Sequence, residues 1–367
     1  MEQNVKISGT QVAMLLFVFI TSTLIIFVPN YTAQAAKESA WLAVSILPFS
    51  FGNLTLWVVC KLGSYFPKLT VFQYCEVILG KFLGKGLGLA YIMYLLVMDV
   101  LVLREFSDFI NITTLPLTPR LWLLASIIAL ALYGAYQGLE VIARAVQFIL
   151  CIYVVGFSIT VLMALTNFDV ARLLPVMEEG LSPIIRGSIA PSSWYGEIFI
   201  LATLFPFVDK SAELKKKGTI ALVAITLFVT VDVIMTLGVL GADLTSKIAV
   251  PFWTVARSIE IGEILQRLEV FLLVIWVTGV IIKASLLCYL INLGITQVLG
   301  FKKLNLVLGA TAVTQLAITN FMLGNASQVS AILGNYWPPF GITFELVIPI
   351  FLLGICWLRK KGKQLKI

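Results

Sequence analysis

Apolar runs long enough to form membrane helices recur along the whole chain. A helical run of about 20 apolar residues crosses the roughly 30 Å hydrocarbon core of a bilayer. The low charge content agrees, because only 12% of the 367 residues are charged, against roughly a quarter in soluble domains. The sequence therefore predicts an all-α polytopic membrane protein.

Hydropathy divides the chain into ten predicted spans within a single membrane domain, 1–367. They cover residues 9–29, 40–61, 87–109, 121–139, 144–165, 188–208, 218–241, 270–291, 304–323 and 339–358. The N-terminus does not resemble a cleaved signal peptide, because Lys6 is its only positive residue and no small-residue cleavage motif follows. The first apolar run is therefore expected to remain as a membrane helix.

The distribution of lysine and arginine predicts the orientation. These residues are about twice as frequent on the side that holds both ends of the chain, and cytoplasmic loops carry such an excess. Both termini are therefore expected in the cytoplasm. Ten spans then divide into two five-helix halves of opposite orientation, 9–165 and 188–358. Inverted halves build many secondary transporters, whose midplane binding site lies where the first helix of each half is broken.

The first span of each half carries unusual polar residues. The first has Thr21, Ser22 and Thr23 in succession, six residues before Pro29, and the sixth is interrupted by Pro191–Glu197. Ser and Thr also occur in intact membrane helices, where their hydroxyls bond back to backbone carbonyls. For the first span alone that alternative is as good as a break. The matching positions of the two polar segments favour a pair of broken helices.

A broken-helix site offers free N–H groups to an anion and free carbonyls to a cation. The predicted ligand-binding residues are Thr21, Ser22 and Thr23 from the first span, and Ser193, Trp194, Tyr195, Gly196 and Glu197 from the sixth. Glu197 would pair with an ammonium group or carry a proton, and a bond to a neighbouring helix is an equally good alternative. Trp194 would form a pocket wall, although packing is the commoner role of such residues.

Four more ionisable residues fall within spans, where burial of a charge costs at least about 2–3 kcal/mol. They are candidates for ion or proton coupling: Asp99, Asp232, Lys283 and Glu345. A structural ion pair is the alternative for Lys283, as is a side chain that extends to the inner face.

The residues predict a binding protein rather than an enzyme. The chain has no His, which excludes His-based nucleophile activation and argues against zinc and haem. The segment "GKFLGKGLG" (80–88) lacks the phosphate-binding pattern and follows no predicted strand. No catalytic residue, metal or cofactor is expected, and the positive charge is explained by topology rather than by nucleic acid.

Short motifs follow one another in a specific order. They are "FPKLTVFQYCEVILGKFLG" (66–84), "LREFSDFI" (103–110), "LPLTP" (115–119), "GLEVIARA" (138–145), "LLPVMEEGLSPI" (173–184) and "LQRLEVFLLVIW" (265–276). As an ordered set they resemble the B-subunit family of bacterial spore germinant receptors, within the amino acid–polyamine–organocation (APC) transporter superfamily. The resemblance covers about residues 5–360.

This resemblance implies a LeuT/APC-like fold of five-plus-five inverted repeats in the inner membrane of the bacterial spore. It implies a sensor of a small nutrient, often an amino acid, that works with a membrane-embedded A subunit and a lipoprotein C subunit. The same fold also suits a proton- or sodium-coupled amino-acid transporter, or an ion or water pore opened by partners.

The family resemblance implies specific roles for one residue and two segments. Some proton-coupled members of the superfamily place a lysine on helix 8 where others bind sodium beside helix 1, which implies this role for Lys283. Thr21–Thr23 stands where many relatives have glycine, so its side chains occupy space beside the ligand. The segment 242–268 is expected to form an outer lid or a contact surface for the lipoprotein.

Overall fold

A computed structural model describes residues 6–259, 269–301, 304–322, 324 and 326–359. Within these ranges the chain is almost wholly helical, and the only strand-like feature is an isolated bridge between Ile7 and Val208. The prediction of an all-α fold is confirmed.

Eight helical segments of the described chain are long and apolar enough to cross a membrane. They comprise α1 (Gly9–Ala36), which continues through a 3-10 turn into α2 (Ala40–Ala43), α3 (Ile46–Tyr65), α5 (Lys81–Thr113), α6 (Arg120–Gln137), α7 (Leu139–Ala164), α10 (Leu214–Leu240), α13 (Glu269–Leu299) and a final segment containing α16 (Trp337–Ile342) and α17 (Ile348–Arg359). They correspond to eight of the predicted spans.

The other two predicted spans are also helical, but neither is long and regular. The sixth consists of α8 (Leu181–Gly196), a 3-10 turn (Glu197–Ile200) and α9 (Leu201–Leu204). The ninth consists of α14 (Leu304–Ala317), which is extended by a π-helical turn (Ile318–Met322). All ten predicted spans therefore have a helical counterpart. The second begins later than predicted, at Ile46, because residues 40–43 form the separate helix α2.

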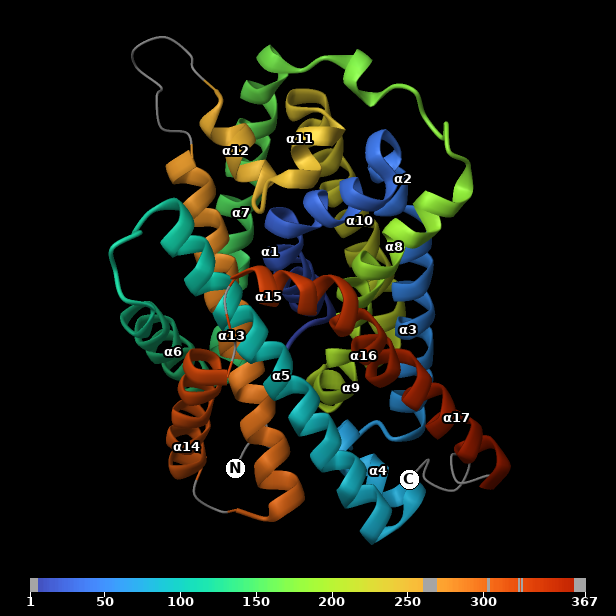
Figure 1. The fold of residues 1–367 in the computed structure, drawn as a ribbon. Helices are drawn as coiled ribbons and strands as arrows, with labels where there is room; N and C mark the ends of the chain where they lie inside the picture. Colours follow the sequence, from blue (N-terminus) through green and yellow to red (C-terminus); the bar gives the residue numbers. More distant parts are fainter. Residues whose placement is uncertain (1–5, 260–268, 302–303, 323, 325, 360–367) are drawn as a thin grey trace.

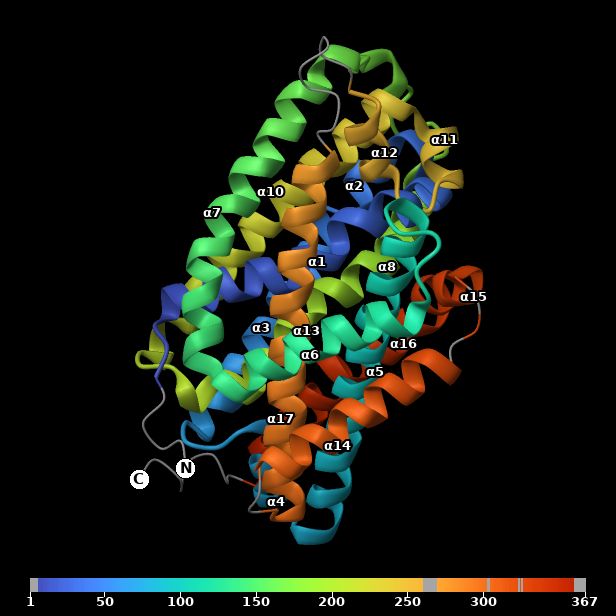
Figure 2. The same cartoon turned by 90° about the vertical axis from the view of Figure 1, so that its left-hand side faces the viewer.

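Helix α1 forms the centre of the molecule (Figures 1 and 2) and contacts α7, α8, α10, α11 and α13. It is apolar on all sides and buried along most of its length, as expected for a helix surrounded by others. The predicted break at Thr21–Thr23 is wrong, because α1 is one continuous helix that also includes Pro29. The hydroxyls bond back to their own helix instead: Thr21 donates to the Phe17 carbonyl at 2.6 Å and Ser22 to the Phe19 carbonyl at 3.0 Å.

The sixth span is interrupted, as predicted, at the end of its polar segment. The α-helical conformation passes through Pro191 and ends at Gly196, and Glu197 begins the 3-10 turn with φ −56° and ψ −14°. The chain tightens here rather than unwinding. The division of the chain into two inverted halves, 9–165 and 188–358, stays a prediction.

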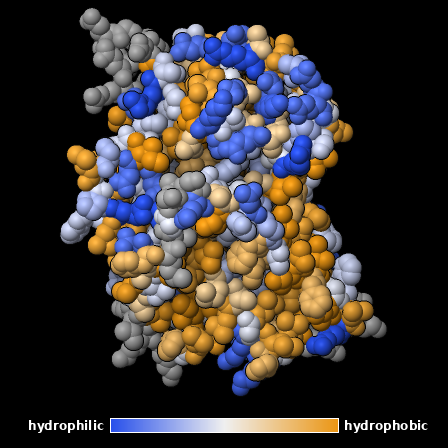
Figure 3. All heavy atoms as spheres, viewed as in Figure 1, coloured by the Kyte–Doolittle hydropathy of each residue, from blue (hydrophilic) through white to orange (hydrophobic). Residues whose placement is uncertain are grey.

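Short helices gather at the two ends of the molecule. Helix α4 (Val71–Leu79) lies at one end, and α2, α11 (Ala242–Lys247) and α12 (Pro251–Arg257) lie at the other (Figure 1). The α11–α12 end is covered largely by hydrophilic residues, whereas hydrophobic residues cover much of the rest of the visible face (Figure 3). The Asn30 amide of α1 fastens α11 by donating to the carbonyls of Thr245, Ser246 and Ile248 at 2.8–3.2 Å.

Candidate functional site

A buried ion pair joins three helical elements at the end of α8. The Nζ of Lys283, on α13, lies 2.7 Å from Oε2 of Glu197, on the 3-10 turn that follows α8. The same ammonium group donates to Thr23 Oγ1 of α1 at 2.9 Å and lies 4.8 Å from the centre of the Phe19 ring. Lys283 is fully buried and Glu197 is 2% exposed. One lysine therefore links α1, α13 and the interrupted helix.

The pairing follows from the cost of burial. A lone ammonium or carboxylate within a membrane protein is strongly unfavourable, whereas a close, hydrogen-bonded pair offsets much of that cost. The Lys283 side chain extends from α13, the eighth predicted span, to Thr23 of α1, the first predicted span. This is the place that the family resemblance implies for a lysine that replaces a sodium ion, and that role stays a prediction.

A second carboxyl group approaches the interruption from the end of the chain. Glu345 lies in a π-helical turn (Thr343–Val347) between α16 and α17 and is fully buried. Its Oε1 accepts a hydrogen bond from the Tyr94 hydroxyl at 2.7 Å, and its Oε2 has no partner among the described residues. A Cβ added to Gly196 would lie 2.0 Å from Glu345 Oε2. Glycine at the end of α8 is therefore what allows this carboxyl group to approach.

The other predicted ligand-binding residues are buried and bonded within the protein. Ser193 donates to the Ala190 carbonyl at 2.8 Å, and Tyr195 to the Val44 carbonyl at 3.1 Å. The Trp194 ring stacks on Tyr31 of α1, with ring centres 6.0 Å apart. Thr21 and Ser22 bond to their own helix, as described above. Of the predicted set, Thr23 and Glu197 meet Lys283, and Gly196 meets Glu345.

Two predicted coupling residues have other hydrogen-bond partners in the described part of the chain. Asp99 of α5 accepts a hydrogen bond from Gln315 of α14, and Asp232 of α10 accepts a weak one, at 3.5 Å, from Thr236 on the next turn. Each keeps one carboxyl oxygen without a partner in the described part of the chain. Neither is hydrogen-bonded to Lys283 there.

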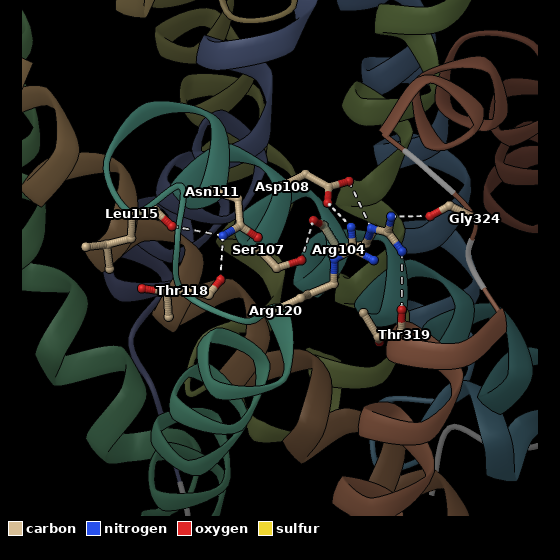
Figure 4. Close-up of polar contacts among 9 residues, drawn as sticks. All are labelled: Arg104, Ser107, Asp108, Asn111, Leu115, Thr118, Arg120, Thr319 and Gly324. Atoms are coloured by element: carbon tan, nitrogen blue, oxygen red, sulfur yellow. Dashed lines mark hydrogen bonds and ion pairs between the residues drawn. The ribbon is translucent and has the colours of Figure 1, made fainter.

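A buried arginine near the C-terminal end of α5 connects this helix to later parts of the chain (Figure 4). It was not among the site residues predicted from the sequence. Arg104 is fully buried, and its guanidinium group lies 2.9 Å from Asp108 and also contacts the carbonyls of Thr319 and Gly324. Asp108 in turn lies 3.3 Å from Arg120, at the start of α6. The sequence could have indicated Arg104, because it is a basic residue inside a predicted span, and such residues usually face the protein interior and pair with an acidic residue or a backbone carbonyl.

A hollow of about 900 Å³ opens beside the site, and we call it the vestibule. Its walls come from the end of α1, the first part of α8, the α11 region and the segment from α15 (Ala326–Ala331) to α16. Tyr31 lines it, and Trp194 stacks beneath Tyr31. Along the sixth span, Trp194 comes between the vestibule residue Ala190 on α8 and Glu197 in the 3-10 turn that follows.

Comparison with known proteins identifies relatives of this chain. The spore germination protein family matches residues 6–329. Spore germination protein YndE of Bacillus subtilis is 28% identical over 98% of both chains, and spore germination protein KB of the same organism is 24% identical over 99% of this chain and 97% of the relative. Spore germination protein XB of Bacillus anthracis is 23% identical over 93% and 94%.

A solved structure shares the fold. The crystal structure of MhsT in complex with L-phenylalanine superposes with a TM-score of 0.70, over 96% of this chain and 99% of MhsT, at 12% sequence identity. The chain is therefore a polytopic helical protein with a LeuT-like, APC-type transporter fold. It belongs to the spore germination protein family of permease-like proteins.

Proposed function

We propose that this chain is the nutrient-sensing membrane subunit of a spore germinant receptor. It binds a small nutrient, an amino acid, at the Lys283–Glu197 pair and passes a conformational change to a membrane-embedded A subunit and a lipoprotein C subunit. The names of the relatives support a role in germination. The excess of lysine and arginine on one side supports cytoplasmic termini, and the spore germination relatives support a place for the chain in the inner membrane of the spore.

The observation that carries the ligand class is the presence of two opposite charges at one buried point, Lys283 and Glu197. An amino acid also carries one carboxylate and one ammonium group. When it inserts between these residues, its carboxylate pairs with Lys283 and its ammonium group with Glu197. No charge is then left buried without a partner, which is the condition for tolerating charges in a low-dielectric interior.

The closed arrangement of the site suits a sensor. Thr23, Glu197 and Lys283 are buried, and along the sixth span Trp194, which stacks on Tyr31, comes between Glu197 and the vestibule residue Ala190. A ligand reaches the ion pair only when these aromatic rings separate and α1 moves relative to α8. A ligand that binds the open arrangement more tightly shifts the population toward it, and that shift is the signal to the partners.

A germination assay with matched variants tests this function. Spores carrying Glu197→Gln are compared with spores carrying Glu213→Gln, which changes an exposed carboxylate outside the site. We expect Glu197→Gln to raise the amino-acid concentration for half-maximal germination at least about tenfold, as one charge-assisted hydrogen bond is lost, and Glu213→Gln to leave it unchanged.

A milder variant guards against misfolding. Thr23→Val keeps the shape of the side chain and removes only the hydroxyl that accepts from Lys283, so we expect a smaller shift in the same direction. Immunoblots of spore membranes verify that each variant accumulates. Wild-type dose responses in both site variants would move the nutrient site elsewhere.

Transport of the amino acid is the second candidate function. Asp99 and Glu345 are buried carboxyl groups that each keep an oxygen without a partner in the described chain, and such groups serve as proton carriers in transporters. Uptake by the purified chain in liposomes separates the candidates. Gradient-driven accumulation of amino acid without partners would establish the transporter and overturn a purely sensing role.

A further inference from the structure

The charged residues that line the vestibule are all positive. Its described lining contains two charged residues, Arg186 and Lys247, and no carboxylate. Lys247 is already paired with Asp243 at 2.7 Å on the same exposed turn of α11. Arg186 is exposed and has no hydrogen bond or ion pair in the part of the chain that the structure describes. It is therefore a guanidinium group without a partner among the described residues, in the wall of a large hollow.

The nearest acidic residues do not neutralise this group by direct contact. Glu178 and Glu179 line a separate, smaller hollow beside the end of α1. The Glu179 carboxylate is held by Lys37 at 2.6 Å. Arg186 thus keeps its hydrogen-bond donors available to a solute.

The position of Arg186 connects the vestibule with the ion pair. Along α8 and the first residue of the 3-10 turn that follows, Arg186, Ala190, Trp194 and Glu197 occur at intervals of four, four and three, which places them close to one face of the span. Arg186 and Ala190 line the vestibule, and Glu197 contacts Lys283. Eleven helical residues rise about 16 Å, so Arg186 of the vestibule lies about that distance along the span from Glu197, the partner of Lys283.

The barrier along this path is aromatic and locally held. The Tyr31 ring stacks on Trp194, and its hydroxyl lies 3.3 Å from Ser330 Oγ of α15. Both interactions can be broken without unfolding a helix. A solute can therefore wait in the vestibule while the barrier is closed.

We propose that the vestibule is a capture site for carboxylate-bearing solutes, distinct from the Lys283–Glu197 site, and that Arg186 binds their carboxylate. A guanidinium group matches a carboxylate with two parallel hydrogen bonds, and a cleft lined by one sign of charge raises the local concentration of the opposite sign. The passage of the captured solute to Lys283 rests on the proposed function. The preference for anions does not.

Cysteine modification by reagents of opposite charge tests the capture site. Ala35→Cys places a thiol on the vestibule wall, beside Gly187 of α8, in the full-length protein with Cys60 and Cys151 changed to alanine. The probes are sulfonatoethyl methanethiosulfonate, which is anionic, and trimethylammonioethyl methanethiosulfonate, which is cationic. Leu117→Cys, in the exposed connection between α5 and α6, provides the reference site.

We expect the anionic reagent to be favoured at Ala35→Cys relative to Leu117→Cys. Arg186→Gln should lower the anion-to-cation rate ratio at Ala35→Cys about fivefold, the effect of one unit charge several ångströms away in water, and Arg186→Lys should retain most of it. Sodium acetate should slow modification of Ala35→Cys by a neutral methanethiosulfonate, and should do so less in Arg186→Gln. An equal ratio at both sites, or a ratio unaffected by Arg186→Gln, would overturn the proposal.

The outcome is separable from the proposed function. If the rate ratio depends on Arg186 but germination does not depend on Glu197, the capture site stands and the nutrient site falls. If germination depends on Glu197 while the vestibule shows no preference for anions, the nutrient reaches the ion pair without capture by Arg186.

Discussion

Lys283 and Glu197 are 86 residues apart in the sequence, and their charged groups lie 2.7 Å from each other in the interior of the helix bundle. Thr23 completes the arrangement from α1, at 2.9 Å from the same ammonium group. The pair forms where α8 gives way to a 3-10 turn. The ion pair, the interruption of the sixth span and the central helix α1 therefore meet at one place.

Removal of one member of this pair should destabilise the protein strongly. Glu197→Gln or Lys283→Met leaves one charge buried without its partner, and we expect a loss of about 3–5 kcal/mol in the free energy of unfolding. The double variant should lose less than either single variant, because it leaves no unpaired charge. Denaturation in detergent micelles measures all four proteins, and additive losses would show that the two residues are not coupled.

Gly196→Ala should be destabilising because the site has no space for a methyl group. The added Cβ would lie 2.0 Å from Glu345 Oε2 and 2.7 Å from the Phe51 ring, and overpacking of this kind costs about 1–3 kcal/mol. Gly354→Ala on α17 is the matched control, since nothing lies within 4 Å of its added Cβ. Thermal unfolding compares them, and an equal effect of both substitutions would contradict the close approach of Glu345.

Arg104 and Arg120 share Asp108 but should differ in their contribution to stability. Arg104 is fully buried and also holds backbone carbonyls, so we expect Arg104→Met to cost about 3–5 kcal/mol by leaving Asp108 and those carbonyls without their main donor. The Arg120 side chain is 33% exposed, and Arg120→Gln should cost at most about 1 kcal/mol. Unfolding in detergent measures both, and similar losses would refute the anchoring role of Arg104.

The bond between Lys37 and Glu179 should show a defined pH dependence. The Lys37 ammonium group donates a hydrogen bond to Glu179 and holds the pKa of that carboxyl below its usual value of 4.5. Because the folded-state pKa is lowered, the stabilisation is present above the unfolded pKa and is lost as the pH falls through the folded one. The small difference in melting temperature between wild type and Glu179→Gln should therefore exist at pH 7 and disappear in strong acid. A difference that grows on acidification would contradict this assignment.

The sequence predicted the spans well because membrane hydropathy is a local property. It also located the interruption near Gly196 and Glu197, since proline, serine, glycine and a carboxylate close together in one apolar run are unusual in a regular membrane helix. The shape of α1 was not predictable from its sequence. Thr21 and Ser22 can bond to their own helix or to a neighbour, and only the packing around α1 decides between the two.

The partners of the buried polar groups were also beyond the sequence. Tyr94 and Glu345 are 251 residues apart, and Arg104 and Thr319 are 215 apart. No local pattern pairs such residues, because the pairing depends on how α5 packs against the last helices. An ionisable residue within a span indicates that a partner exists without indicating which one.

Calorimetric titration of the purified protein with a panel of amino acids tests the central claim most directly. Wild type is compared with the double variant Lys283→Met/Glu197→Gln, which lacks both charges and leaves neither unpaired. We expect at least one amino acid to bind wild type and to bind the double variant at least about a hundredfold more weakly, because two charge-assisted hydrogen bonds of about 1.5–3 kcal/mol each are lost. Equal affinity in the two proteins, or no binding of any amino acid to wild type, would contradict the account.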